Sequence, residues 1–171
     1  MICPRSAPLR SLLVALLGVA GCNYGFSGGG GLPSNLHTAY VPPIQNKTSQ
    51  FDLTDEFNAM LVNAVRSKLG LQLASAAEAD AIITATLVGY DDRALNFEAV
   101  QDEGAQVFER QVTIRAAVEI RDVEQDIVVW SSPGVTGLGN YRPATELDTT
   151  GKEMALESLV QKIVDGAQSQ W

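Results

Sequence analysis

The longest regular pattern in the chain is an alternation of apolar and polar residues from Phe108 to Arg121. Successive side chains of a β-strand point to opposite faces, so the alternation separates a buried face from a polar one. Only Arg110 interrupts the apolar set and only Ala117 interrupts the polar set. The pattern predicts one long strand in a sheet with a core on one side. Helices must then cover the apolar face, and the polar face stays open.

Two other segments repeat apolar residues at the three- and four-residue spacing of an amphipathic helix. The first is predicted to begin after an N-cap at Asp52 and to end at Gly70. The second is predicted to begin at Thr150, because Thr150 and Glu153 fit a capping box, and to run to about Gln170. Their apolar stripes are the expected cover for the apolar face of the sheet.

Three shorter strands are expected at Thr38–Val41, Ala81–Tyr90 and Asp126–Ser132. The segment Ala81–Tyr90 is apolar and β-branched at both parities, which is typical of a central strand. The polar run Asp91-Asp92-Arg93 is interpreted as the turn that ends this strand. Asp102-Glu103-Gly104 is a further turn signal.

The last predicted strand should point Val128 and Trp130 inward, and the glycine-containing segment Gly134–Asp148 is interpreted as a loop. The element order is therefore β-α-β-β-β-α. It predicts an α+β fold in which two helices pack on one face of a four-stranded mixed sheet. The polar face of the long strand and the loops Asp91–Val107 and Gly134–Thr149 are the expected contact surfaces.

The N-terminus predicts export from the cytoplasm. Two cations, Arg5 and Arg10, precede an apolar stretch at Leu12–Ala20. The stretch is too short to span a bilayer, which takes roughly 20 apolar residues. A basic start, a short apolar region and small residues before a break are typical of a secretory signal peptide.

The break itself, Val19-Ala20-Gly21-Cys22, resembles the bacterial lipobox. The resemblance implies cleavage before Cys22 and acylation of its thiol and its new amino group, which anchors a protein stably. The alternative is an ordinary signal peptide that leaves Cys22 as a free thiol. By resemblance to lipoprotein sorting rules, aspartate directly after the cysteine would favour retention in the inner membrane. Asn23 stands there instead, so the expected location is the periplasmic face of the outer membrane.

These features divide the chain into a signal peptide (1–21), a lipidated cysteine with a glycine-rich tether (22–35) and a single domain (36–171). Removal of the signal takes away two of the 12 basic residues and none of the 20 acidic ones, which leaves a formal charge of about −10. A surface of this charge repels nucleic acid, so no nucleic-acid partner is expected.

Residues suited to catalysis or metal binding are scarce. His37 is the only histidine, and the two cysteines are Cys3, within the signal, and Cys22. No nucleophile has a paired base, and no Gly-x-Ser-x-Gly occurs. We therefore expect no enzyme, no metal site and no cofactor, and a function in binding.

Several short blocks together resemble one family. Their order and spacing are similar to those of the LptE family of lipopolysaccharide-assembly lipoproteins. Two positions depart from the family pattern: Asn23 stands where glycine is usual and Ile44 where an aromatic residue is common. The blocks are Cys22-Asn23-Tyr24-Gly25-Phe26, Val41-Pro42-Pro43-Ile44-Gln45-Asn46-Lys47-Thr48, Ala79-Asp80-Ala81-Ile82-Ile83, Val128-Val129-Trp130 and Tyr141.

The resemblance implies a lipoprotein that plugs the LptD β-barrel at one to one, supports its assembly and assists insertion of lipopolysaccharide into the outer leaflet. Two alternatives stay open: an activator of a periplasmic cell-wall synthase and an auxiliary lipoprotein of a lipid transporter. The short tether favours a partner at the membrane.

Contact with lipopolysaccharide, which is polyanionic, requires local cations on this acidic chain. Arg93 and Arg142 are expected in loops at strand ends and are the candidate residues for lipid phosphate. The alternative is that each pairs with a nearby acid. Arg115 and Arg121 are expected on the open face of the long strand.

Overall fold

A computed structural model describes residues 31–100 and 104–169 of the chain. The predicted signal peptide, Cys22 and most of the tether lie outside this part, as does most of the predicted turn at 102–104. The helices are α2 (Leu53–Ser67) and α3 (Asp148–Gln168). The strands are β1 (Thr38–Tyr40), β2 (Gln45–Asn46), β3 (Gln72–Leu73), β4 (Ala81–Val100), β5 (Gly104–Asp122) and β6 (Ile127–Tyr141).

One mixed sheet holds these strands in the order β3-β1-β4-β5-β6, and β2 also pairs with β4. β1 and β2 run parallel to β4, whereas β4, β5 and β6 are antiparallel neighbours. The predicted α+β class with two helices and a mixed sheet is confirmed. The predicted four strands are wrong, because the sheet has six. The two additional strands, β2 and β3, have two residues each, too few to produce a periodic sequence signal.

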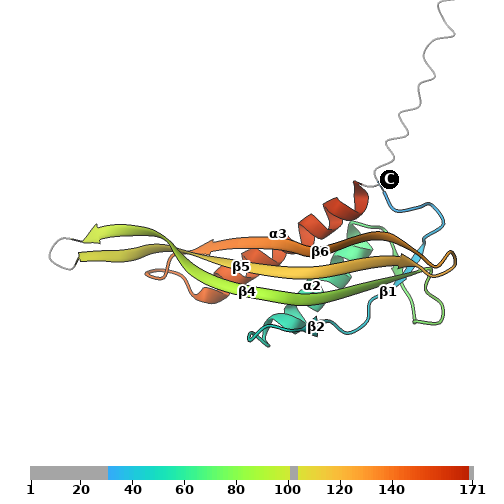
Figure 1. The fold of residues 1–171 in the computed structure, drawn as a ribbon, viewed down its shortest axis with the longest axis horizontal. Coiled ribbons are helices and arrows are strands. Elements are labelled where there is room, and N and C mark those ends of the chain that lie inside the picture. The colour runs from blue at the N-terminus through green and yellow to red at the C-terminus, as the bar shows by residue number, and fades with distance from the viewer. Residues whose placement is uncertain (1–30, 101–103, 170–171) are drawn as a thin grey trace, which may run out of the picture.

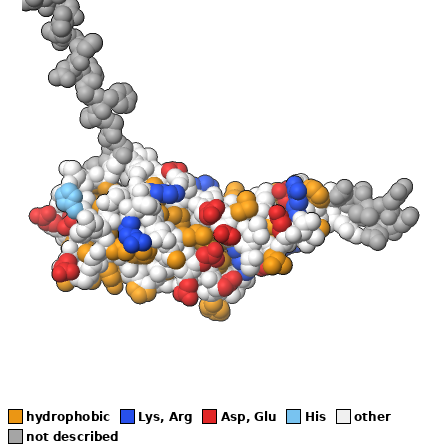
Figure 2. Space-filling view, turned by 180° about the vertical axis from the view of Figure 1, so that it is seen from behind, with side chains coloured by type: hydrophobic (Ala, Val, Ile, Leu, Met, Phe, Trp, Pro, Cys, Tyr) orange, Lys and Arg blue, Asp and Glu red, His pale blue; other side chains and the backbone are white. Residues whose placement is uncertain are grey.

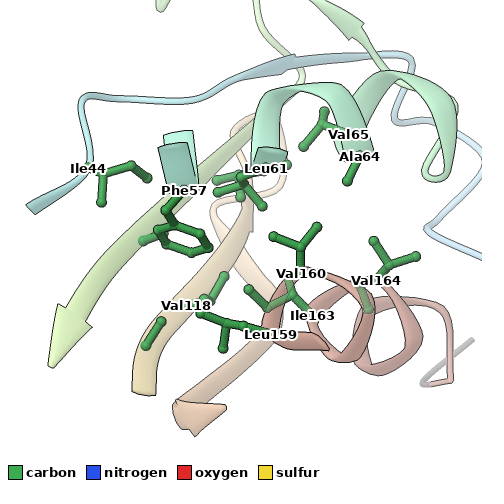
Figure 3. Packing of buried hydrophobic residues seen from close by; sticks show 14 of the residues in the cluster. Ile44, Phe57, Leu61, Ala64, Val65, Val118, Leu159, Val160, Ile163 and Val164 are labelled. Atoms are coloured by element: carbon green, nitrogen blue, oxygen red, sulfur yellow. The ribbon is translucent and has the colours of Figure 1, made fainter. Parts of the chain in front are cut away.

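Both helices lie on the same side of the sheet, with α2 beside α3 (Figure 1). The apolar parity of β5 is buried beneath them from Val112 to Ile120, as the alternation predicts, whereas Phe108 of the same predicted set is 44% exposed. Phe57 and Leu61 of α2 and Leu159 of α3 point into this layer toward Val118 (Figure 3). Burial of these side chains is the main stabilising contribution, at about 1.5–3 kcal/mol for each large side chain.

The polar run Asp91-Asp92-Arg93 does not end the second long strand. β4 continues through it to Val100, paired with β5 along its whole length. The charged groups are satisfied across the strands: Arg110 Nε donates to Asp92 Oδ1 at 3.0 Å, and Arg93 donates to Gln111 Oε1 at 3.1 Å. A turn was predicted because these cross-strand partners cannot be seen in a local sequence window.

The predicted loop after Gly134 is also largely strand, since β6 extends to Tyr141. Gly137 and Gly139 lie directly under α3. A Cβ at Gly137 would come within 2.0 Å of the Ala155 carbonyl oxygen, and one at Gly139 within 2.1 Å of the Gly151 carbonyl oxygen. The glycines therefore mark close helix-to-strand packing.

Near the start of β6, Trp130 is buried as predicted, but Val128 is 44% exposed and Val129 is buried in its place. The register shifts here: Ile120 pairs with Trp130, whereas Arg121 pairs with Val128. The additional residue forms a β-bulge and brings Val129 and Trp130 to the buried side together.

Both helix starts differ in detail from the predicted caps. Asp52 occupies the N-cap position of α2, but its side chain makes no capping bond and instead accepts from Lys152 Nζ at 3.1 Å. α3 begins at Asp148, with Leu147 at the N-cap and no side-chain cap. The Thr150–Glu153 capping box is therefore not formed, because the helix starts two residues earlier.

Candidate functional site

The β4–β5 hairpin projects beyond the rest of the molecule (Figure 1). The last pair between β5 and β6 joins Arg110 to Tyr141, whereas β4 and β5 stay paired as far as Val100 and Gly104. Residues 95–100 and 104–109 thus extend past the end of β6, and we call them the distal arm. Neither helix covers this two-stranded ribbon. It exposes Phe97 (63%), Phe108 (44%) and Leu95 (39%).

A hydrogen-bonded cluster joins three strands at the base of the arm. Asp92 of β4 accepts from Arg110 Nε of β5 at 3.0 Å and from the hydroxyl of Tyr141 of β6 at 2.9 Å. Burial and the bond to Asp92 raise the pKa of Tyr141, and the same carboxylate raises the pKa of Arg110. The cluster thus bonds β4, β5 and β6 to one another where the arm begins.

The opposite face of the sheet carries a second set of hydrogen bonds at the base of the arm, which runs from Arg93 to Glu109 through two amide side chains. Arg93 donates to Gln111, whose amide donates to Asn140 Oδ1 at 3.1 Å. Asn140 in turn donates to Glu109 Oε1 at 3.1 Å, and Asn96 donates to Glu109 Oε2 at 2.6 Å. These bonds cross β4, β5 and β6. The arm is therefore bracketed on both sides by polar contacts where it leaves the sheet.

The two arginines predicted to contact lipid phosphate lie in this region, although Arg93 is on β4 rather than in a loop. Arg142 follows β6, as expected, and its guanidinium carbon lies 5.3 Å from the centre of the Phe108 ring. Both side chains are exposed. Within the described part of the chain, neither forms an ion pair with a carboxylate. Both guanidiniums thus remain accessible at the base of the arm.

The polar parity of β5 forms the centre of an open face, shared with β4 and β6. Cross-strand pairing places Arg115 between Gly89 of β4 and Thr136 of β6. Arg121, further along, pairs with Glu119 and Asp126 at 3.1 Å each. Hydroxyl groups border a shallow hollow of about 390 Å³ on this face. Its lining includes Thr84, Thr86, Glu119, Ser131 and Ser132.

The helix-covered side differs in charge. Acidic side chains gather over the first turns of α2 and α3 (Figure 2). Burial, and the nearby Glu153 and Asp52 carboxylates, raise the pKa of Glu56. Lys152 is the buried cation of this region and bridges Asp52 and Asp148 at 3.1 Å each. This ion-paired lysine joins the two helix starts.

The Asp92–Arg110–Tyr141 cluster was not predicted from sequence. Its signal was Arg110, the one residue that interrupts the apolar parity of β5. His37 lies in an exposed position before β1, and its backbone N–H donates to Asp80 Oδ2 at 2.9 Å. Among the described residues, His, Cys, Asp and Glu do not group in threes that could hold a metal ion. No helix in that part of the chain is long and apolar enough to cross a bilayer.

Comparison with known proteins gives one family match. The model of the family described as LptE, lipopolysaccharide-assembly, matches residues 36–169. No protein with a curated description matches the chain.

Several solved structures share the fold. PelC from Paraburkholderia phytofirmans, solved as a dodecamer, is 17% identical with a TM-score of 0.51 over 81% of this chain and 94% of that one. Lipoprotein B from Nitrosomonas europaea is 17% identical with a TM-score of 0.52 over 82% and 86%. A protein from Xanthomonas campestris is 12% identical with a TM-score of 0.52 over 81% and 87%. At these identities the likeness extends to the fold alone.

Proposed function

Since the chain belongs to the LptE family of lipopolysaccharide-assembly proteins, we propose that it is an outer-membrane lipoprotein that plugs an LptD-like β-barrel. In this role it supports assembly of the barrel and assists insertion of lipopolysaccharide into the outer leaflet, without catalysing a reaction. The observation that carries the proposal is the family match across residues 36–169, which spans the whole described domain.

The described domain has properties that a plug requires. Its sheet exposes a hydrogen-bonding face suited to a hydrated lumen, and its helices close the core on the other side. The membrane anchor would be Cys22, with a diacyl lipid on its thiol and an acyl chain on its amino group. Cys22 lies outside the described residues. A chain with two or more acyl groups stays on the membrane, whereas a single chain binds only marginally.

Arg93 and Arg142 are the residues we assign to contact with lipopolysaccharide. Their guanidiniums are exposed at the base of the arm, and guanidinium groups bind phosphate through charge-assisted, often bidentate hydrogen bonds. Replacing both by alanine should weaken binding of purified lipopolysaccharide by about tenfold or more. Arg66→Ala, a change on the exposed side of α2, is the matched control. Unchanged affinity in the double variant would remove this assignment.

The test of the function is recovery of the partner from the native host. The chain carries a C-terminal tag, the outer membrane is solubilised gently, and proteins recovered in stoichiometric amount are identified. We expect one large β-barrel at one to one. Recovery of a cell-wall synthase or of a transporter component would replace the proposal with the corresponding alternative, and recovery of no partner would leave only the family and the fold.

A further inference from the structure

Several charged side chains of the open face are bonded to one another. Arg121 is paired with Glu119, and Arg93 is bonded to Gln111. Glu109 accepts from both Asn96 and Asn140. Because these side chains already have partners, each gains less from pairing with a protein carboxylate than an unbonded arginine on the same face would.

Arg115 is the exception among the arginines of this face. It is exposed at the centre of the three antiparallel strands, and its side chain makes no hydrogen bond or ion pair within the described part of the chain. Its side chain lies across Gly89: a Cβ at that position would stand 3.1 Å from Arg115 Nε. Glycine here leaves the guanidinium room to lie close to the backbone of β4. The result is a held but unpartnered cation in the middle of a polar surface.

The charge of the two sides differs in a way that favours the sheet as the docking side. Asp91, Glu109, Glu119 and Asp126 on the open face are nearly balanced by Arg93, Arg115 and Arg121. On the helix side, acids outnumber bases around the starts of α2 and α3 (Figure 2). A protein surface that carries carboxylates is therefore repelled by the helix side and can pair with Arg115 on the other.

The area of the open face is about three-quarters of what one partner contributes to a standard interface. β5 pairs with both neighbours from Arg110 to Asp122, so the three strands cover about 14 Å by 43 Å, roughly 600 Å². One partner in a standard protein interface contributes about 800 Å². Exposed Val88, Val128 and Leu138 make part of this area apolar. Arginine at the centre of such a patch is a common energetic hot spot.

We propose that the open face of β4, β5 and β6 is the surface that docks against the inner wall of the partner barrel, and that Arg115 pairs there with a carboxylate of that wall. The proposal rests on the proposed function for the identity of the partner. It assigns protein docking to Arg115 and leaves lipid contact to Arg93 and Arg142.

The first test is charge reversal in the full, membrane-anchored chain. Arg115→Glu should reduce recovery of the barrel by about tenfold or more, since it places two carboxylates together in the interface. Arg115→Lys keeps the charge but loses the planar donor pair, so its loss should be smaller. Arg66→Glu is the matched control and should recover the barrel as the unchanged chain does. Thermal unfolding of each variant checks that the exposed substitution leaves the domain folded.

The second test separates the docking face from the identity of the partner. A photo-crosslinking residue replaces Leu138 or Thr84 on the open face, or Glu157 on the helix side, with and without Arg115→Glu. We expect cross-links to the barrel from the open face that Arg115→Glu removes. Cross-links to a different membrane protein that Arg115→Glu removes would support the docking face and sink the proposed function. The inference would be overturned by cross-links that form only from Glu157, or by no cross-links from either face. It would also be overturned by cross-links from the open face that join only a second copy of this chain or that persist in Arg115→Glu.

Discussion

Lys152 shows how a single buried charge is held in this domain. Its side chain is 10% exposed, and its Nζ lies 3.1 Å from both Asp52 and Asp148. Burial lowers the pKa of Lys152, but the two carboxylates outweigh it, and the net shift is upward. One lysine thus joins the start of α3 to the start of α2.

Two substitutions of Lys152 distinguish the cost of losing its ion pairs from the cost of placing a like charge beside Asp52 and Asp148. Lys152→Met keeps the apolar stem and leaves two carboxylates that are more than half exposed, so it should lower the free energy of unfolding by about 1 kcal/mol. Lys152→Glu adds a buried carboxylate beside acids and should cost about 3 kcal/mol or more. Urea unfolding of the three proteins measures both values. Equal losses in the two variants would show that both lose only the ion pairs and that the added carboxylate of Lys152→Glu causes no charge conflict.

At the scale of elements, the packing of α3 on β6 depends on two positions without side chains. The backbone of the helix lies against Gly137 and Gly139, where any Cβ would overlap Ala155 or Gly151. Close approach of this kind lets the apolar stripe of α3 reach the buried parity of β5. The glycines are thus part of the core, although they contribute no side chain to it.

Gly137→Ala should therefore destabilise the domain by about 3 kcal/mol, because neither the strand nor the helix backbone can yield locally. Gly134→Ala lies in the same strand with nothing within 4 Å of the added Cβ, and it should change stability by about 0.5 kcal/mol or less. Thermal unfolding of the pair provides the comparison. A loss as large in Gly134→Ala would indicate that strand propensity, and not the helix contact, governs this segment.

The same elements show what could be predicted from sequence. The helix stripes, the long alternating strand and the central strand follow from periodicity, because each has enough residues to repeat. The extension of β4 past Tyr90 and of β6 past Ser132 could not be predicted in that way. Their determinants are long-range: the partner of Asp92 is Arg110 on another strand, and the partner of Gly137 is α3. Arg93 was consequently predicted in a loop and lies on a strand.

At the scale of the whole molecule, two aspartates bind the beginning of the described chain to the start of β4 and the end of β5. Asp80 accepts from the backbone N–H groups of His37 and Thr38 at 2.9 Å each. Asp122 accepts from the Gln125 N–H at 2.9 Å and the Asn35 amide at 2.8 Å. These bonds lower the pKa of both carboxyls, led by the His37 N–H for Asp80 and the Gln125 N–H for Asp122.

The sign of the pH dependence follows from these shifts. A carboxyl whose folded pKa is depressed stabilises the fold above its unfolded pKa, near 3.9, and loses that contribution as pH falls through the folded value. Glu56 acts in the opposite sense, since burial and the neighbouring Glu153 and Asp52 raise its pKa. Asp80 and Asp122, whose pKa values are lowered by several hydrogen-bond donors, should dominate the pH dependence of stability. The urea midpoint is expected to be level from about pH 7 to pH 5 and to fall below about pH 4.

Asp80→Asn tests whether the loss of stability at low pH comes from protonation of Asp80. The amide cannot carry the charge that the His37 and Thr38 N–H groups stabilise, so the variant should be less stable than the unchanged chain at pH 7. At pH 3 the aspartate is itself partly protonated, and the difference between the two proteins should shrink. Measuring both urea midpoints across this range distinguishes the explanations. A difference that stays constant with pH would mean that Asp80 acts through shape and hydrogen-bond number alone, and that the acid sensitivity of the molecule lies in other carboxyls.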